Sequence, residues 1–331
     1  MIKLSVIIPT KNRCEYLRDA LCSMTEQTIA SEEYEVIVID NGSTDNTKAV
    51  CEEVGKRFCN FEYYYEATPG LHVGRNLGMQ LCKGEILVYA DDDILVQPEW
   101  LSAIESTFVS MPEVGLVGGN IYPQYEGNVP RWLPALWIDK GEGQILDTYS
   151  VVIFNSDDGY IDANFIFGCN FAIRKSILTK AGGFHPDGMP SDLLRFRGDG
   201  ESHVSNYINL SGVYKAYYCK NASVYHRINE QRLSLEYLDS VSFRQGVSRI
   251  FGVLRYKSLY FAIVELLRDI VREEKYSVLN SEINIIRRKK KEIQRGMLFL
   301  IIQYCKSKEL RRWIHQGDYM DEKGDARKYD S

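Results

Sequence analysis

The sequence predicts an α/β fold in which helices flank a mostly parallel, Rossmann-like central sheet, with a helical extension at the C-terminus. Short β-branched runs alternate with helical segments over the first third of the chain, as in parallel βαβ units whose sheet is covered on both faces. Turn-forming residues follow several of these runs, which is where such units change direction. Beyond residue 233 the hydrophobic pattern is helical.

The predicted strands are short apolar runs, and two of them end on aspartate. The second ends at Asp40, before the turn Asn41-Gly42-Ser43, and the fourth ends on the triplet that begins at Asp91. Ligands of open α/β sheets lie beyond the carboxyl ends of the strands, so both positions are expected in one crevice. The five strands expected in this part are 4–8, 34–39, 61–65, 86–90 and 114–117.

Helical periodicity and capping residues place helices between these strands. Thr44 or Asp45 is suited to cap the second helix, and Pro98 fits the first turn of the fourth. The four helices expected here are 16–25, 44–58, 73–81 and 98–109. Further along, we expect one or two strands in 161–173, a helix from 175, a polar loop at 195–200, a helix to 210, strands at 213–218 and 223–225, and helices at 233–254, 259–272 and 279–304.

Residues 120–160 interrupt this rhythm. They contain Trp132, Trp137, several prolines and glycines, and no clear hydrophobic period, which is typical of an inserted lobe or active-site loop. We therefore expect a catalytic domain at 1–228, with halves at 1–119 and 120–228, and a helical extension at 229–331. The last dozen residues are expected to be loose.

Charge is distributed unevenly along the chain, whose net charge is -5. Residues 1–228 are acidic, whereas 229–331 are basic and include the run Arg287-Arg288-Lys289-Lys290-Lys291. A basic helix of this kind fits peripheral contact with a membrane face. A helical appendage that packs on the catalytic domain, or that forms a homodimer, is the alternative, and no nucleic-acid partner is expected.

Cysteine usage and hydropathy point to a cytoplasmic protein. The 8 cysteines are scattered and form no CxxC pair, which suits a reducing compartment better than a zinc site or a disulfide framework. The N-terminus runs directly into a strand and has no signal-peptide pattern. The apolar runs near the C-terminus are far shorter than the roughly 20 residues that span a bilayer.

The triplet Asp91-Asp92-Asp93 is the first candidate for chemistry. Adjacent carboxylates repel one another, and a divalent cation such as Mn²⁺ or Mg²⁺, which prefers oxygen ligands, would offset that repulsion. In an extended backbone Asp91 and Asp93 point the same way, whereas Asp92 faces away. Alone, the triplet fits a solvated acidic turn equally well.

The order and spacing of several motifs are more specific than the triplet. Together they resemble family 2 glycosyltransferases of the GT-A fold over about residues 3–228. The matching stretches are Ser5 to Arg13, Val38 to Asp45, Pro69-Gly70, Arg75 to Gly78 and Asp91 to Asp93. Weaker matches are Gly168-Cys169-Asn170, Gly182-Gly183-Phe184, Gly198 to Glu201 and Val224 to Arg227.

The resemblance implies an inverting transfer of a sugar from a nucleotide-diphosphate donor, with a UDP-sugar favoured, to a hydroxyl of a saccharide or lipid-linked acceptor. It implies roles in the synthesis of envelope polysaccharide or glycoconjugates. The residues it assigns to the nucleotide sugar are Pro9, Thr10, Arg13, Asp40, Arg75, Asp91 and Asp92. The residues it assigns to the metal are Asp93, Asp91 and His226.

The catalytic base is expected in the loop Gly198-Asp199-Gly200-Glu201. An inverting transfer needs a carboxylate that takes the proton of the attacking hydroxyl, and the flanking glycines let the backbone approach a ligand closely. The family commonly has Glu-Asp here, whereas this chain has Asp-Gly-Glu, so both carboxylates are candidates, with Asp199 favoured over Glu201. Both residues could instead only cap the following helix.

Two other classes of protein fit parts of the sequence. A nucleotidyltransferase acting on sugar phosphates also combines an α/β sheet with acidic metal ligands, but Pro9 to Arg13 contains no glycine for a triphosphate loop. A non-catalytic glycan-binding relative would keep the fold. The intact Asp91, Asp93, Asp199 and Glu201 favour an enzyme over that relative.

Overall fold

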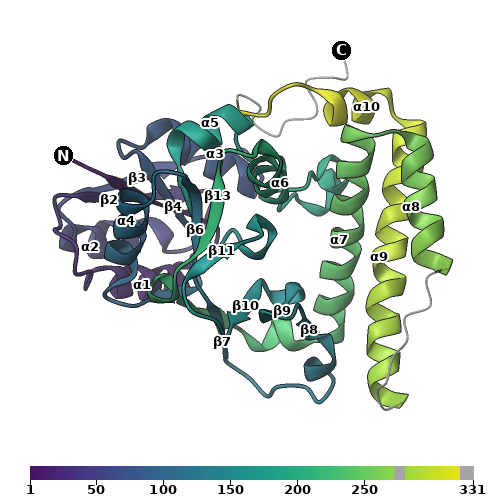
Figure 1. Cartoon of the computed structure of the whole chain (residues 1–331), viewed down its shortest axis with the longest axis horizontal. Helices are drawn as coiled ribbons and strands as arrows, with labels where there is room; N and C mark the ends of the chain where they lie inside the picture. Colours follow the sequence, from purple (N-terminus) through teal and green to yellow (C-terminus); the bar gives the residue numbers. More distant parts are fainter. Residues whose placement is uncertain (272–279, 321–331) are drawn as a thin grey trace.

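The computed structural model describes residues 1–271 and 280–320. Its main feature is an eight-stranded sheet with the strand order β11-β13-β6-β12-β4-β1-β2-β3 (Figure 1). Only β12 and β11 run against their neighbours, so the mostly parallel sheet expected from the sequence is confirmed. The strands are β1 (Leu4–Thr10), β2 (Tyr34–Asp40), β3 (Phe61–Tyr65), β4 (Ile86–Ala90), β6 (Val114–Gly118), β11 (Gly159–Ile161), β12 (Asn170–Arg174) and β13 (Lys215–Tyr218).

Helices cover both faces of this sheet because side chains of each strand alternate between two cores. Val6 and Ile8 of β1 join one core with α1, α2 and α4. Ile7 joins the other core with α3, α5 and α6. These helices are α1 (Cys14–Met24), α2 (Thr47–Val54), α3 (Leu71–Leu81), α4 (Trp100–Ser110), α5 (Lys175–Ala181) and α6 (Ser202–Ser211). The expected second helix is shorter than predicted, since a 3₁₀ turn at Gly55–Arg57 follows Val54.

The region 120–160 is more regular than its sequence suggests. It supplies four strands to a six-stranded second sheet with the order β5-β14-β7-β10-β9-β8. The sequence shows no clear period here because the strands are very short and β7 pairs with β14, about a hundred residues away. The inserted lobe or active-site loop expected at 120–160 stays a prediction. The strands are β5 (Ile94–Val96), β7 (Ile121–Tyr125), β8 (Ile138–Asp139), β9 (Gly143–Leu146), β10 (Val151–Phe154) and β14 (Val224–Ile228).

The C-terminal region is helical, as expected. It comprises α7 (Leu235–Tyr256), α8 (Leu259–Val271), α9 (Asn280–Lys306) and α10 (Lys308–His315), which share a separate core around Phe251, Met297 and Trp313. Figure 1 shows α7 lying between the sheets and the other two long helices. Helix α10 was not anticipated, and the expected loose terminus lies outside the described residues apart from Met320.

Glycine sets the distance between α7 and α9. A Cβ atom on Gly246 would lie 2.0 Å from the carbonyl oxygen of Ile293, and one on Gly296 would lie 1.9 Å from that of Phe243. The two backbones therefore approach each other closely at this crossing. No helix among the described residues is long and apolar enough to cross a membrane.

Candidate active site

Two adjoining cavities open beyond the carboxyl ends of the central strands. The smaller, of about 250 Å³, is lined by Pro9, Thr10, Lys11, Arg13, Asn41, Leu71, Asp91, Asp92 and Gly188. The larger, of about 590 Å³, shares Leu71, Asp91 and Gly188 with it and extends to α7. Asp91 thus stands where the two cavities meet.

The three aspartates of the triplet have different surroundings. Thr10 donates to Asp92 at 2.7 Å, and Arg13 pairs with Asp92 at 2.8 Å. Burial raises the pKa of Asp92 to about 7, and Arg13 only partly opposes this. Asp92 therefore faces the smaller cavity rather than pointing away from the site, as the extended-strand argument had suggested.

Asp93 is the buried centre of a cationic cluster. Arg13 lies 2.7 Å from its carboxylate, Arg232 3.0 Å and His226 3.3 Å. Burial alone would raise the pKa of Asp93, but these neighbours, His226 first, hold it well below its usual range. Asp93 is therefore ionised at any ordinary pH, although it lines neither cavity.

Asp40 lies at the expected strand end, but each of its carboxylate oxygens already accepts a hydrogen bond from the protein. Tyr63 donates to one at 2.8 Å and the backbone N–H of Ser43 to the other at 2.8 Å. Asp40 does not line the smaller cavity, whereas its neighbour Asn41 does. The structure thus brings Pro9, Thr10 and Arg13 together with the triplet, and places Asn41 where Asp40 was expected.

Arg75 connects the triplet to the catalytic loop. Its guanidinium lies 3.2 Å from Glu201, 3.4 Å from Asp91 and 3.5 Å from Asp187. A Cβ atom on Gly168 would lie 2.4 Å from this guanidinium, so only glycine leaves room for it. The α3 arginine is therefore a buried site residue and not a surface ion pair.

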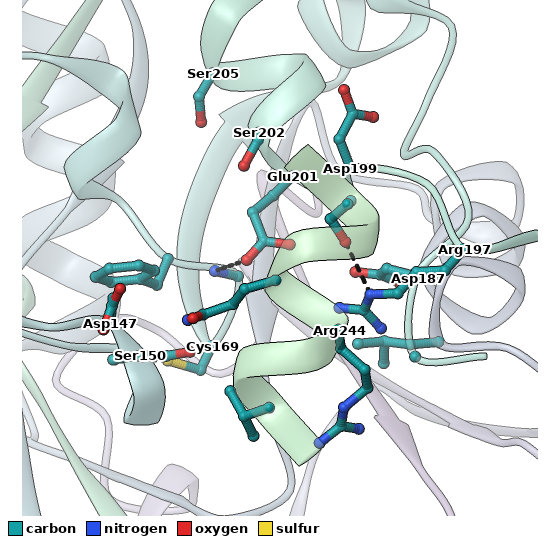
Figure 2. Close-up of a pocket in the computed structure, with 18 of the residues that line it drawn as sticks. Asp147, Ser150, Cys169, Asp187, Arg197, Asp199, Glu201, Ser202, Ser205 and Arg244 are labelled. Carbon is teal, nitrogen blue, oxygen red and sulfur yellow. Dashed lines mark hydrogen bonds between the residues drawn. The ribbon is translucent and has the colours of Figure 1, made fainter. Parts of the chain in front are cut away.

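Glu201 and Asp199 differ in what they face. Glu201 points into the larger cavity and accepts from the backbone N–H of Gly168 at 3.2 Å (Figure 2). Burial would raise its pKa, but Arg75 and backbone N–H groups lower it, so Glu201 is ionised. Asp199 also lines the larger cavity, but its carboxylate contacts the ring of His185 at 2.5 Å, and that ring stacks on His203 with centroids 3.6 Å apart.

The glycines of this loop serve protein contacts. A Cβ atom on Gly200, whose φ is +58°, would lie 2.7 Å from Asp187, and one on Gly198 would lie 2.7 Å from the carbonyl oxygen of Pro186. The loop is thus packed tightly on the segment that carries Asp187, while Gly200 also lines the larger cavity.

Several residues that line the cavities were missed in the sequence. Asp187, Arg197, Arg232 and Arg244 line the larger cavity, and Lys11 and Asn41 line the smaller one. Burial raises the pKa of Asp187 to about 6 although Arg75 opposes the rise. The basic composition after residue 229 was the only available signal for Arg232 and Arg244, and it did not distinguish them from surface arginines.

The site combines the acidic triplet beyond β4 with the loop that carries Asp199 and Glu201. On this sheet, that combination defines an enzyme of the GT-A glycosyltransferase type. Residues 5–182 match the family model described as "Glycosyl transferase family 2". Because this match covers more than half of the chain, the protein belongs to glycosyl transferase family 2, and the resemblance seen in the sequence is confirmed.

Similar proteins agree with this assignment. Glycosyltransferase AglE of Haloferax volcanii is 38% identical over 119 residues, which is 36% of this chain and 39% of that protein. Glucosyl-dolichyl phosphate glucuronosyltransferase of the same organism is 22% identical over 75% of this chain and 76% of its own length. The GalNAc(5)-diNAcBac-PP-undecaprenol beta-1,3-glucosyltransferase of Campylobacter jejuni is 32% identical over 42% of this chain and 45% of its own.

Solved structures share the fold. The mannosyltransferase PcManGT of Pyrobaculum calidifontis, in complex with GDP-Man and Mn²⁺, has a TM-score of 0.51 at 14% identity and covers 92% of this chain and 75% of its own. S. aureus TarS 1-349, in complex with UDP-GlcNAc, has a TM-score of 0.52 at 16% identity, covering 98% of this chain and 88% of its own. Both include the C-terminal helical region in the comparison, which supports the fold predicted for it.

Proposed function

We propose that the protein transfers a sugar, with inversion, from a nucleotide-diphosphate donor to a hydroxyl of a saccharide acceptor in glycoconjugate synthesis. The observation that carries this proposal is the position of Asp91. It stands between a small polar cavity beyond β1 and β4 and a larger cavity that holds the carboxylate loop. A nucleoside in the first cavity would place its sugar toward the second.

The smaller cavity suits a nucleoside and its diphosphate. Lys11 supplies positive charge, and Asn41 supplies an amide beside the turn that follows β2. A UDP-sugar is the donor that we favour from the sequence, and the structural neighbours include complexes with UDP-GlcNAc and GDP-Man. We therefore propose uracil as the nucleotide base, and the donor sugar stays open between those of the two neighbours.

We propose that Asp93 and His226 supply two protein ligands to a divalent cation, next to the arginines paired with the other carboxylate oxygen of Asp93. Its buried Oδ1 atom has no hydrogen-bond partner and lies 3.3 Å from Nε2 of His226. Two ligand atoms at about 2.1 Å from one Mg²⁺ or Mn²⁺ in octahedral geometry are about 3 Å apart. Diphosphate oxygens and water commonly complete such sites.

Asp91, the third proposed ligand, is not in that position in this structure. Its carboxylate pairs with Arg75, and the described residues contain no group of three acidic, histidine or cysteine side chains around one ion position. We therefore propose Asp93 and His226 as the protein ligands and Asp91 as a contact of the donor sugar. The cation would neutralise charge on the departing diphosphate.

For the transfer itself we propose Glu201 as the base, with Asp199 as a positioning residue. The acceptor oxygen bonds to the anomeric carbon while Glu201 takes its proton, and the bond from that carbon to the diphosphate oxygen breaks with its electron pair on the leaving group. Glu201 is ionised and faces the cavity. Asp199 holds the loop through His185.

The acceptor is proposed to be lipid-linked and to be met at a membrane face. Two of the relatives carry a polyprenol in their names. Helix α8, which packs beside α9, exposes Tyr260, Leu267 and Ile270 by half or more. On α9, exposed Arg287, Lys291, Leu298 and Ile302 recur at the spacing of one helix face, a composition that suits an anionic lipid surface.

A thermal-shift screen tests the donor proposal. Nucleoside diphosphates with Mn²⁺ or Mg²⁺ should raise the melting temperature, with the largest shift for the correct base, because a ligand that binds only the folded state stabilises it. The matching UDP- or GDP-sugar should then be hydrolysed slowly without acceptor. A protein that no diphosphate stabilises under either metal, and that hydrolyses no donor, would favour the non-catalytic alternative.

A further inference from the structure

The larger cavity is lined by both carboxylates and arginines, and two of its arginines form no ion pair among the described residues. Five arginines line the cavity: Arg75, Arg197, Arg232, Arg244 and Arg249. Arg75 pairs with three carboxylates, and Arg232 pairs with Asp93. Arg249 pairs with Glu265 at 2.5 Å and with Asp269 at 2.9 Å. Three of the five are thus balanced within the protein.

Arg197 and Arg244 form no ion pair within the described part of the chain. Arg197 donates from Nε to the hydroxyl of Ser248 at 2.9 Å, and Arg244 donates from Nε to the backbone carbonyl of Ser240 at 3.2 Å. In each case one hydrogen bond from Nε orients the side chain. The two terminal nitrogens of the guanidinium then stay available, and these are the pair that binds planar or tetrahedral oxyanions. Both side chains border the cavity in Figure 2.

These guanidiniums lie apart from the proposed nucleoside subsite. Neither lines the smaller cavity, and Arg244 also lines a third cavity, of about 320 Å³, with residues of α9 such as Glu292. Burial lowers the pKa of Arg197, and the nearby carboxylates Asp187 and Glu201 only partly oppose this, so a bound anion would offset the remaining cost of burying the charge. Gln245, on the same helix, has a buried side-chain oxygen without a donor, as expected where a ligand hydroxyl would bind.

We infer that Arg197 and Arg244 form a subsite for an anionic group of the acceptor saccharide, a phosphate ester or a carboxylate. This inference rests on the proposed function and narrows it, because it makes the acceptor of the transfer a charged one. The α7 helix then selects the acceptor, while the N-terminal strands bind the donor.

Calorimetric titration of three small probes tests the inference: glucose 1-phosphate, methyl β-glucuronide and methyl β-glucoside, each with and without saturating UDP and Mn²⁺. The wild type should bind at least one anionic probe about tenfold or more tightly than the neutral one, as expected for charge-assisted hydrogen bonds. The phosphate and carboxylate probes distinguish the two sources of charge. The double variant Arg197→Gln/Arg244→Gln should lose the preference.

Arg249→Gln is the matched control, since Arg249 lines the same cavity but is already paired. It should keep the preference for the anionic probe. Equal affinity for the three probes, including no detectable binding of any, would overturn the subsite, as would a preference that survives in the double variant. UDP titrations separate this from the donor proposal: a double variant that loses UDP affinity as strongly as probe affinity would show a donor-phosphate site instead.

Discussion

Arg75 lies 3.2 Å from Glu201 and 3.4 Å from Asp91, so one buried guanidinium joins the carboxylate beyond β4 to the carboxylate that faces the larger cavity. The side chain of Arg75 is 3% exposed. Because removing one partner of a buried pair leaves an uncompensated charge, Arg75 holds both halves of the site at a fixed separation.

Glu201→Gln should lower kcat by about a thousandfold while donor affinity stays near the wild-type value, because general bases contribute about 10²–10⁴-fold. Steady-state kinetics with the donor and acceptor varied separately provide the measurement. Asp199→Asn is the comparison, and its loss of kcat should be clearly smaller, because Asp199 acts through His185. A larger loss in Asp199→Asn than in Glu201→Gln would reassign the base to Asp199.

Gly246→Ala should destabilise the protein by about 3 kcal/mol, the upper end of the usual cost of overpacking, because the new methyl would meet the backbone of α9 at 2.0 Å. Urea unfolding measures the effect. Gly252→Ala, on the same helix, is the control: its Cβ would meet only Asp199 at 3.4 Å, and alanine is the better helix former by about 1 kcal/mol. Similar stabilities for the two variants would mean that α7 and α9 do not cross closely.

His72 is fully buried, and burial lowers its pKa from 6.5 to about 3. Above pH 6.5 the ring is neutral in both the folded and unfolded states. As pH falls below 6.5 the unfolded chain gains a proton that the folded protein does not, so this residue destabilises the fold progressively down to about pH 3. One pKa unit corresponds to about 1.4 kcal/mol.

Replacing this ring should therefore flatten the acid dependence of the free energy of unfolding. Between pH 7.5 and pH 5, His72→Leu should lose about 2 kcal/mol less than the wild type. The difference between the two proteins is the quantity to measure, because the raised pKa values of Asp92 and Asp187 act in the opposite direction in both. Parallel pH profiles would show that His72 is protonated in the folded state.

The wild-type protein should co-sediment with vesicles that contain anionic lipid. The double variants Leu267→Glu/Leu298→Glu and Arg287→Gln/Lys291→Gln should each co-sediment to a smaller extent. Each exposed basic residue is worth about 1 kcal/mol at such a surface, so zwitterionic vesicles should not respond to the basic pair. Val109→Glu, on an α4 position that is 72% exposed, is the matched control. Light scattering that shows a dimer, lost in Leu267→Glu/Leu298→Glu, together with no co-sedimentation, would favour a protein interface over a membrane.

The first strands along the chain and their ends were predictable because local periodicity and turn residues determine them, and the family was predictable from the resemblance of the motifs. Strands 61–65 and 86–90 occur as expected, and Thr10, Arg13 and the triplet do meet. The second sheet was not predictable, since β7 pairs with a strand far along the chain. The roles of Arg75, Asp187 and the α7 arginines depend on contacts between distant segments, which no local pattern encodes.

The most direct test of the account is the metal dependence of UDP binding in Asp93→Asn, measured by calorimetry. The wild type should bind UDP with Mn²⁺ and lose most of that affinity when the metal is chelated. Asp93→Asn should bind weakly under both conditions, and so should His226→Asn, which leaves the arginines paired with Asp93, while Glu201→Gln should retain metal-dependent binding. With folding checked by circular dichroism, wild-type UDP affinity in Asp93→Asn, or wild-type binding that is unchanged by chelation, would contradict the account.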